Sequence, residues 1–198
     1  MADAHGGDRA SNIVVDRILM LAERLLGEPP SAVISSLVIE ELSKVNNLLF
    51  RDPAFGPTTA TVGIVDRVAA VEVVTVGDSP AFAVHYGVAK LLELPKSAGS
   101  FFLGKQMSTP ASLAQETTVH TLSADSWTDI VLATDGISLA DDDFLAPRRA
   151  IQAILETRSD ATNRAARLVE WSVEKHRIDG AEDDVSALWI ANSKKRRV

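Results

Sequence analysis

At residues 130–136 the sequence reads Ile-Val-Leu-Ala-Thr-Asp-Gly, an apolar run that ends abruptly in an acid and a glycine. The run is long enough for one buried strand, and the acid at its end is Asp135. A buried strand that ends in this way holds a carboxylate at the rim of the core, where a ligand can reach it. The stretch therefore predicts a strand and a candidate functional residue together.

Other segments place acids in comparable positions. Asp78 follows a second apolar run, Asp183 and Asp184 precede a third, and Asp3 stands close to His5 near the amino end. The chain has no cysteine, which excludes thiolate metal sites. Each acid alone could equally be an ordinary turn residue, because Asp and Gly favour turns. Taken together, the acids indicate a metal site built from oxygen ligands.

The composition is typical of one globular domain. The chain has 198 residues, of which 46% are hydrophobic, and a net charge of −7. This charge argues against a nucleic-acid footprint, and no apolar run reaches the roughly 20 residues that span a membrane. The amino end shows no signal-peptide pattern, so we expect a cytoplasmic protein with neither nucleic acid nor membrane as partner. We expect one domain over residues 1–192 and a basic tail over residues 193–198.

The spacing of apolar residues predicts helices towards both ends of the chain and strands between them. The predicted helices are residues 9–26, 31–50, 144–157 and 161–176. The predicted strands are residues 58–65, 69–76, 81–86, 88–94, 119–122, 129–134 and 185–191. Residues 95–116 carry Gly, Ser and Pro with little periodicity, which indicates a long surface excursion.

The expected fold class is α+β. Residues 58–65 and 69–76 should form a hairpin, and residues 119–122 should pair with residues 129–134. The last strand, residues 185–191, is apolar on both faces and should lie centrally between packed layers. Because both helix pairs need a sheet to cover, we expect two antiparallel sheets packed as a sandwich with helices outside.

Carboxylates gathered at strand ends could support phosphate chemistry. Mg²⁺ and Mn²⁺ prefer carboxylate, carbonyl and water oxygens. Two such ions about 4 Å apart can activate a water for attack on phosphorus, and a histidine can protonate the leaving oxygen. In this chain the ligands would be Asp3, Asp78, Asp135 and Asp183, and the proton donor would be His5.

The segment from Asp3 to Gly7, Asp-Ala-His-Gly-Gly, resembles the Asp-Gly-His-Gly-Gly motif of the metal-dependent protein phosphatases, the PPM or protein phosphatase type 2C family. Four later segments resemble further motifs of that family in the same order. They are residues 56–60 with its Gly-Ser/Thr-Ala, residues 76–79 with its Val-Gly-Asp-Ser, residues 133–136 with its Ser-Asp-Gly, and residues 182–186 with its closing Asp-Asn-x-Thr. The resemblance covers nearly the whole chain.

The resemblance implies a role for individual residues. The implied ligands of two or three Mg²⁺ or Mn²⁺ ions are Asp3, the carbonyl of Ala4, Asp78, Asp135 and Asp183. Asp3 would bridge two ions, and His5 would be the general acid. The implied activity is hydrolysis of phosphoserine and phosphothreonine in a phosphoprotein substrate by a metal-activated water, with a protein kinase as a candidate partner.

Two features depart from the family pattern. The family carries a phosphate-binding Arg and a further metal-binding acid upstream of this first motif, and no counterpart precedes Asp3. In addition, Asp184 replaces a family Asn, and Pro80 stands where many members have an Arg. We therefore expect a domain that is incomplete at its N-terminus and impaired in activity. The alternative is a catalytically inactive relative that retains the fold as a binding or regulatory module.

Overall fold

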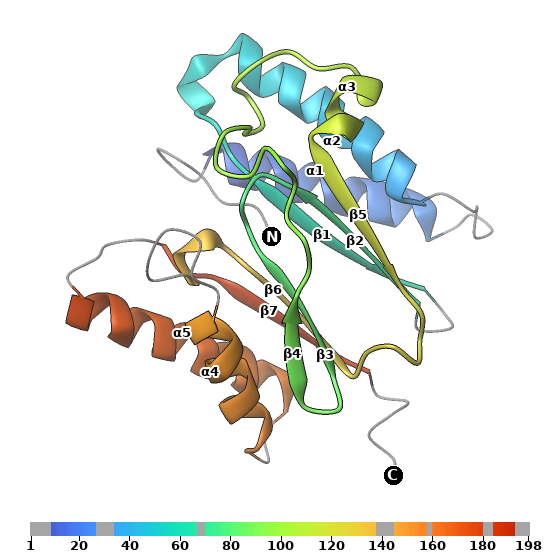
Figure 1. The fold of residues 1–198 in the computed structure, drawn as a ribbon. Coiled ribbons are helices and arrows are strands. Elements are labelled where there is room, and N and C mark those ends of the chain that lie inside the picture. Colours follow the sequence, from blue (N-terminus) through green and yellow to red (C-terminus); the bar gives the residue numbers. More distant parts are fainter. Residues whose placement is uncertain are drawn as a thin grey trace.

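The fold is a sandwich of two antiparallel sheets with a layer of helices outside each sheet (Figure 1). The computed structural model describes residues 9–26, 34–66, 70–137, 145–157, 160–179 and 184–192. The predicted α+β class is therefore confirmed. The first motif, from Asp3 to Gly7, and the basic tail lie outside the described residues.

The first helix layer covers a three-stranded sheet. Helices α1 (Arg9–Leu25) and α2 (Ile34–Arg51) pack on strands β1 (Ala60–Val65), β2 (Val71–Val76) and β5 (Thr117–Leu122). The strand order is β1-β2-β5, so the predicted hairpin of β1 and β2 is confirmed, with Val62 opposite Val74. Val14 and Leu21 of α1 are both buried and lie two turns apart on the same face, which is why the apolar spacing predicted this helix correctly.

The second helix layer covers a four-stranded sheet. Helices α4 (Leu145–Leu155) and α5 (Ala161–Asp179) pack on strands β3 (Ala81–His85), β4 (Val88–Leu91), β6 (Asp129–Ala133) and β7 (Ala187–Ala191). The strand order is β4-β3-β6-β7. Every residue of β6 is buried, because one face of the strand meets the helices and the other meets the first sheet.

The core has three parts: one under each helix layer and one between the two sheets. Alternate side chains along a strand point into different parts. In β2, Val74 and Val76 face the first helix layer, whereas Val71 and Val73 face the opposite sheet. Between the sheets they meet a cluster that includes the buried Trp127. This period of two is what a sheet covered on both faces requires.

The predicted pairing of residues 119–122 with residues 129–134 is wrong. Strand β5 pairs with β2, and β6 pairs with β3 and β7 in the other sheet. Residues 123–128 do not form a hairpin turn; they carry the chain from one sheet to the other, with Trp127 buried on the way. The Thr128 N–H donates to the Val84 carbonyl at 2.7 Å and so joins this crossover to β3.

The last strand lies between layers, as expected, but it is not central within its sheet. Within the described residues β7 pairs only with β6 and forms an edge, where Leu188 is 47% exposed. Trp189, on the face that meets α5, is 5% exposed. The apolar residues on both faces of β7 therefore indicate that layers pack above and below the strand. They do not indicate its position in the strand order of the sheet.

The excursion over residues 95–116 is fixed to α2. It contains a short helix, α3 (Pro110–Gln115), whose N-cap is Thr109. The buried Asn46 donates to the Gln106 carbonyl at 2.7 Å and accepts the Gly104 N–H at 2.7 Å. No helix in the described ranges is long and apolar enough to cross a membrane.

Candidate metal centre

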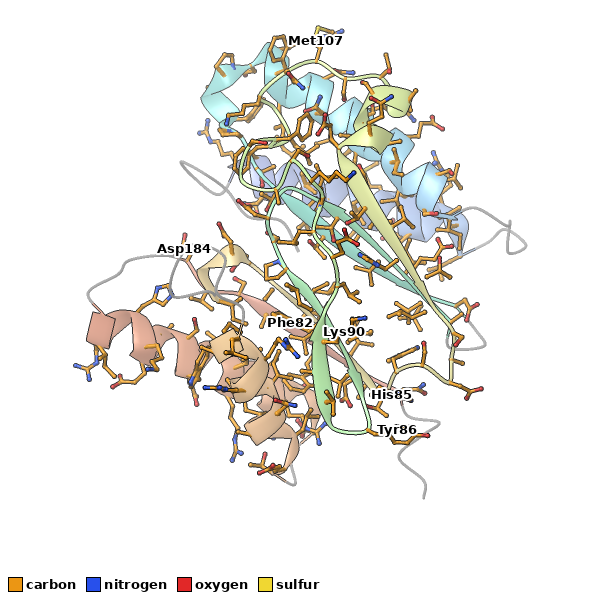
Figure 2. The ribbon with its side chains drawn as sticks, in the orientation of Figure 1. Phe82, His85, Tyr86, Lys90, Met107 and Asp184 are labelled. Atoms are coloured by element: carbon orange, nitrogen blue, oxygen red, sulfur yellow. The ribbon has the colours of Figure 1, made fainter. Side chains whose placement is uncertain are left out.

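The candidate site lies at the ends of β2 and β6 and at the start of β7. Figure 2 shows Asp184 beside the start of β7, at the opposite end of the second sheet from Tyr86 in the β3–β4 turn. Of the predicted site residues, the structure describes Asp78 and Asp135. The others, Asp3, Ala4, His5 and Asp183, lie outside the described residues.

Asp78 leaves β2 through a turn that only glycine accommodates well. Gly77 has a φ of 87°, and a Cβ atom there would lie 2.6 Å from the Cγ2 atom of Thr59. Ser79, which follows Asp78, is fully buried, and its hydroxyl is hydrogen-bonded to that of Thr59 at 2.6 Å. The Thr61 hydroxyl donates to the Ser79 carbonyl at 2.7 Å. Thr59, just before β1, and Thr61 within it thus hold Ser79, the residue that follows the half-buried Asp78.

Asp135 begins a 3₁₀ turn directly after β6. Its Oδ1 atom accepts the Gly136 N–H at 3.1 Å, and the side chain is half-buried. The hydroxyl of Ser172 in α5 donates to the Gly136 carbonyl at 3.0 Å. A helix of the outer layer therefore holds the turn that carries this carboxylate.

Hydrogen bonds at the end of β6 join the three acid-bearing segments. On one side, the Ala133 N–H donates to the Pro80 carbonyl at 3.0 Å, two residues after Asp78. On the other side, the Thr134 hydroxyl donates to the Asp184 carbonyl at 3.0 Å and accepts the Ser186 N–H at 2.9 Å. The end of β6 is thus the common anchor of all three segments, as their predicted places at strand ends imply.

The excursion also reaches this end of the sandwich. A Cβ atom built on Gly99 would lie 3.9 Å from the Oδ2 atom of Asp78. Thr58 and Leu103 exchange two backbone hydrogen bonds, of 3.0 and 2.8 Å, which hold the excursion against the entry to β1. Asp78 is therefore flanked by a loop that is distant from it in sequence.

Among the described residues, no three His, Asp or Glu side chains form a ready metal-binding group. The hydroxyl residues Thr59, Thr61, Thr134 and Ser172, which position the acid-bearing turns, were not predicted as site residues. Thr59 and Thr134 lie within the segments 56–60 and 133–136 that resemble family motifs, but neither was assigned a role. A hydroxyl that supports a turn leaves no periodic pattern, because its partner is distant in sequence.

His176 is another buried side chain on α5, close to the residue that holds the Asp135 turn. It is 6% exposed, and neither ring nitrogen has a hydrogen-bond partner in the part of the chain that the structure describes. It lies one helical turn after Ser172, on the same face of α5. By contrast, the Nε2 atom of His120 is hydrogen-bonded to the Glu93 carbonyl at 2.8 Å.

No family model matches this sequence, and neither does any curated protein. Solved structures of bacterial phosphatases do match the fold. A bacterial serine phosphatase is similar over 97% of this chain and 84% of its own, with 15% identity and a TM-score of 0.72. The serine/threonine phosphatase Stp1 from Staphylococcus aureus is similar over 96% of this chain and 81% of its own, with 15% identity and a TM-score of 0.71.

A third match is the phosphatase domain of the cell fate determinant SpoIIE from Bacillus subtilis, in crystals presoaked with manganese. It is similar over 87% of this chain and 72% of its own, with 15% identity and a TM-score of 0.54. These identities are low, so the likeness establishes architecture rather than activity. The chain therefore has the fold of the bacterial serine/threonine phosphatases, the PPM-type fold that its sequence motifs resemble.

Proposed function

We propose that this chain is a metal-dependent protein serine/threonine phosphatase. The observation that supports this most directly is the joining of the segments of Asp78, Asp135 and Asp184 at the end of β6. The same two-sheet architecture occurs in bacterial serine/threonine phosphatases. The proposed substrates are proteins that carry phosphoserine or phosphothreonine.

The described donors suit a hard divalent cation. Asp135 uses Oδ1 for the Gly136 N–H, and its Oδ2 accepts no hydrogen bond from a described residue. A carboxylate oxygen at the half-buried rim of a core, in a chain without thiols, is the ligand that Mg²⁺ and Mn²⁺ prefer. We propose Asp78 and Asp135 as ligands, together with Asp183, Asp3 and the carbonyl of Ala4. The manganese-soaked SpoIIE crystals make Mn²⁺ a reasonable first ion to test.

When bound, such cations would supply a nucleophilic water near neutral pH and offset the negative charge of the phosphate. The chain's own contribution would be positional. Ser172 holds the turn of Asp135, and Thr134 holds the carbonyl of Asp184, the residue that directly follows Asp183. His5 is the proposed donor of the proton that the leaving serine or threonine oxygen needs.

The proposal is tested by Mn²⁺ titration calorimetry and by release of phosphate from a phosphothreonine peptide. Asp135→Asn and Asp78→Asn keep the size of each side chain while removing a negative ligand. We expect Asp135→Asn to weaken Mn²⁺ binding at least tenfold, and to lower turnover by about 10²–10³, the usual cost of losing one charged group in an active site. The resemblance implies that Asp78, together with Asp135, offers a third and weaker ion site, so Asp78→Asn should have the smaller effect.

Glu156→Gln is the matched control, because Glu156 is an exposed acid at the end of α4, in the helix layer. It should bind Mn²⁺ and release phosphate as the wild type does. Equal Mn²⁺ affinity in wild type and Asp135→Asn would contradict the proposed ligand set. Mn²⁺ binding that depends on Asp135 without any phosphate release would instead favour the non-catalytic binding module.

A further inference from the structure

A groove opens on the outer surface of the second helix layer, between α4 and α5. Its volume is about 450 Å³, within the range of sites that bind small ligands or single peptide side chains. We call it the α4–α5 groove and define it by Ala146, Arg149, Ala150, Ile154, Arg167 and Trp171. It belongs to neither the acid-bearing turns nor the excursion over residues 95–116.

The base of the α4–α5 groove is apolar because α4 presents small side chains there. Ala146 and Ala150 are one helical turn apart, so they leave space that larger residues would fill. Ile154 continues the same face of α4, and Trp171 of α5 borders the groove from the other side. Trp171 is half-buried, whereas the other two tryptophans of the chain are 1% and 5% exposed.

Two arginines give the groove a local positive charge. Arg149 and Arg167 are both exposed, and neither forms an ion pair with a described residue. Other arginines of these helices are engaged. Arg164 pairs with Asp129 at 3.1 Å, Arg177 pairs with Glu174 at 2.7 Å, and the Nε atom of Arg148 donates to the Ala89 carbonyl at 3.1 Å. The groove therefore holds two cations that pair with no described residue, in a chain whose net charge is −7.

We infer that the α4–α5 groove binds an acidic segment of a partner protein that inserts an aliphatic or aromatic side chain between Arg149 and Arg167. The apolar base would take up the inserted side chain, and each guanidinium would pair with a carboxylate beside it. A free phosphate would leave the apolar base uncovered. A flat membrane surface would not reach into a concave groove.

The binding role does not rest on the proposed phosphatase activity, although α5 connects the two regions. Trp171 borders the groove, and the next residue, Ser172, donates to the Gly136 carbonyl beside Asp135. The groove and the candidate metal centre therefore use adjacent faces of one helix. A direct binding measurement tests the groove without any reference to phosphate release.

The test uses a fluorescein-labelled peptide, Glu-Asp-Leu-Glu-Asp-Phe-Glu, and the full chain. Anisotropy should report saturable binding below about 1 mM, and the affinity should fall as salt is added, because exposed charges are screened. With unlabelled peptide, the emission of the tryptophans should change in wild type and not in Trp171→Phe. The amide peptide Gln-Asn-Leu-Gln-Asn-Phe-Gln should bind at least about tenfold more weakly, since it lacks both ion pairs.

The charge contribution is isolated by matched variants. The double variant Arg149→Gln, Arg167→Gln should weaken binding of the acidic peptide by about tenfold, because it removes two exposed ion pairs. Arg51→Gln with Lys90→Gln removes the same charge from exposed positions elsewhere and should leave affinity within about twofold. Ala150→Leu, which fills the apolar base, should weaken binding with the charges unchanged.

Several outcomes would overturn the inference. One is the absence of peptide binding up to about 1 mM. Another is equal affinity in wild type and in the Arg149→Gln, Arg167→Gln variant, or equal affinity for the acidic and amide peptides. Tighter binding to phosphatidylserine vesicles than to the peptide, lost in the same arginine variant, would assign the groove to a membrane surface instead.

Discussion

Gly77 determines how Asp78 leaves β2. Its φ of 87° is unfavourable for any residue with a Cβ atom, and the space that a Cβ atom would need is already taken by Thr59. At the scale of single residues, the position of this carboxylate thus depends on a neighbour without a side chain. Thr59 and Ser79, hydrogen-bonded and buried, complete the same support.

We predict that Gly77→Ala lowers the free energy of unfolding by about 3 kcal/mol, from backbone strain and the clash with Thr59 together. Urea denaturation measures it. Gly87→Ala is the matched control, because Gly87 has a φ of 77° but no atom within 4 Å of a new Cβ. It should cost only the strain, about 1 kcal/mol. Equal losses of unfolding free energy in the two variants would show that Thr59 moves away from the new Cβ atom without destabilising the fold.

At the scale of elements, a buried ion pair attaches α5 to the second sheet. The Oδ1 atom of Asp129 accepts Arg164 at 3.1 Å and the Nε1 atom of Trp189 at 2.8 Å. Arg164 also lies over the Trp189 ring, 5.8 Å from its centroid. One helix and two strands, β6 and β7, therefore meet at one carboxylate.

We predict that Arg164→Met destabilises the chain by about 3 kcal/mol, because it removes the cation that pairs with the buried Asp129 carboxylate. Arg167→Met, on the exposed face of the same helix, should change stability by less than about 0.5 kcal/mol. Thermal and urea unfolding of both variants provide the comparison. In Arg164→Met with Asp129→Asn, the combined loss should be smaller than the sum of the single losses, and an additive result would argue against a direct coupling.

A second ion pair on α5 is fully exposed and should show its effect through pH. The hydrogen bond from Arg177 lowers the pKa of Glu174 in the folded chain. A lowered pKa means that the ionised carboxylate stabilises the fold above its unfolded pKa, near pH 4, and that this stability is lost as the pH falls through the folded pKa. The Tm difference between wild type and Glu174→Gln should therefore be small and positive at pH 7 and disappear in acid. A difference that persists unchanged below about pH 3 would contradict this assignment.

The pairing of elements also shows where sequence reasoning reached its limit. Helices were located well because each has one buried face, and the acids of Asp78 and Asp135 were correctly expected directly after strands. The partner of β5 was not predictable in the same way. Strands close in sequence commonly form hairpins, whereas residues 123–128 cross between the sheets with Trp127 buried between them, a long-range contact that local spacing does not indicate.

At the scale of the whole molecule, the close approach of the two sheets depends on Gly63. A Cβ atom at Gly63 of β1 would lie 3.2 Å from the Cδ1 atom of Leu132 in β6 and 3.7 Å from that of Ile190 in β7. This role could not be predicted from the residue type, because glycine in a strand is also common at bulges. Packing between the sheets depends on which residues face each other across them, and only the assembled sandwich defines these pairs.

We predict that Gly63→Val destabilises the chain by about 2 kcal/mol by overpacking the space between the sheets. Leu132→Ala alone should cost about 3 kcal/mol as a cavity. The stability loss of the double variant should be smaller than the sum of the two single losses, because the methyl groups that Gly63→Val introduces occupy the space that Leu132 vacates. Urea denaturation of the four proteins gives the cycle, and simple additivity would show that the two residues do not compete for space.

The crossover between the sheets has a consequence for how the chain is made. The first sheet has all its described strands once residue 122 has been synthesised, whereas the second waits for residues 187–191. Strands β3 and β4 are produced earlier, yet β3 lacks its neighbour β6 until residue 133. On the ribosome, α1, α2 and the first sheet can therefore assemble as a platform before the rest emerges. The acid-bearing turns then come together last, when the segment of Asp184 reaches the Thr134 hydroxyl at the end of β6.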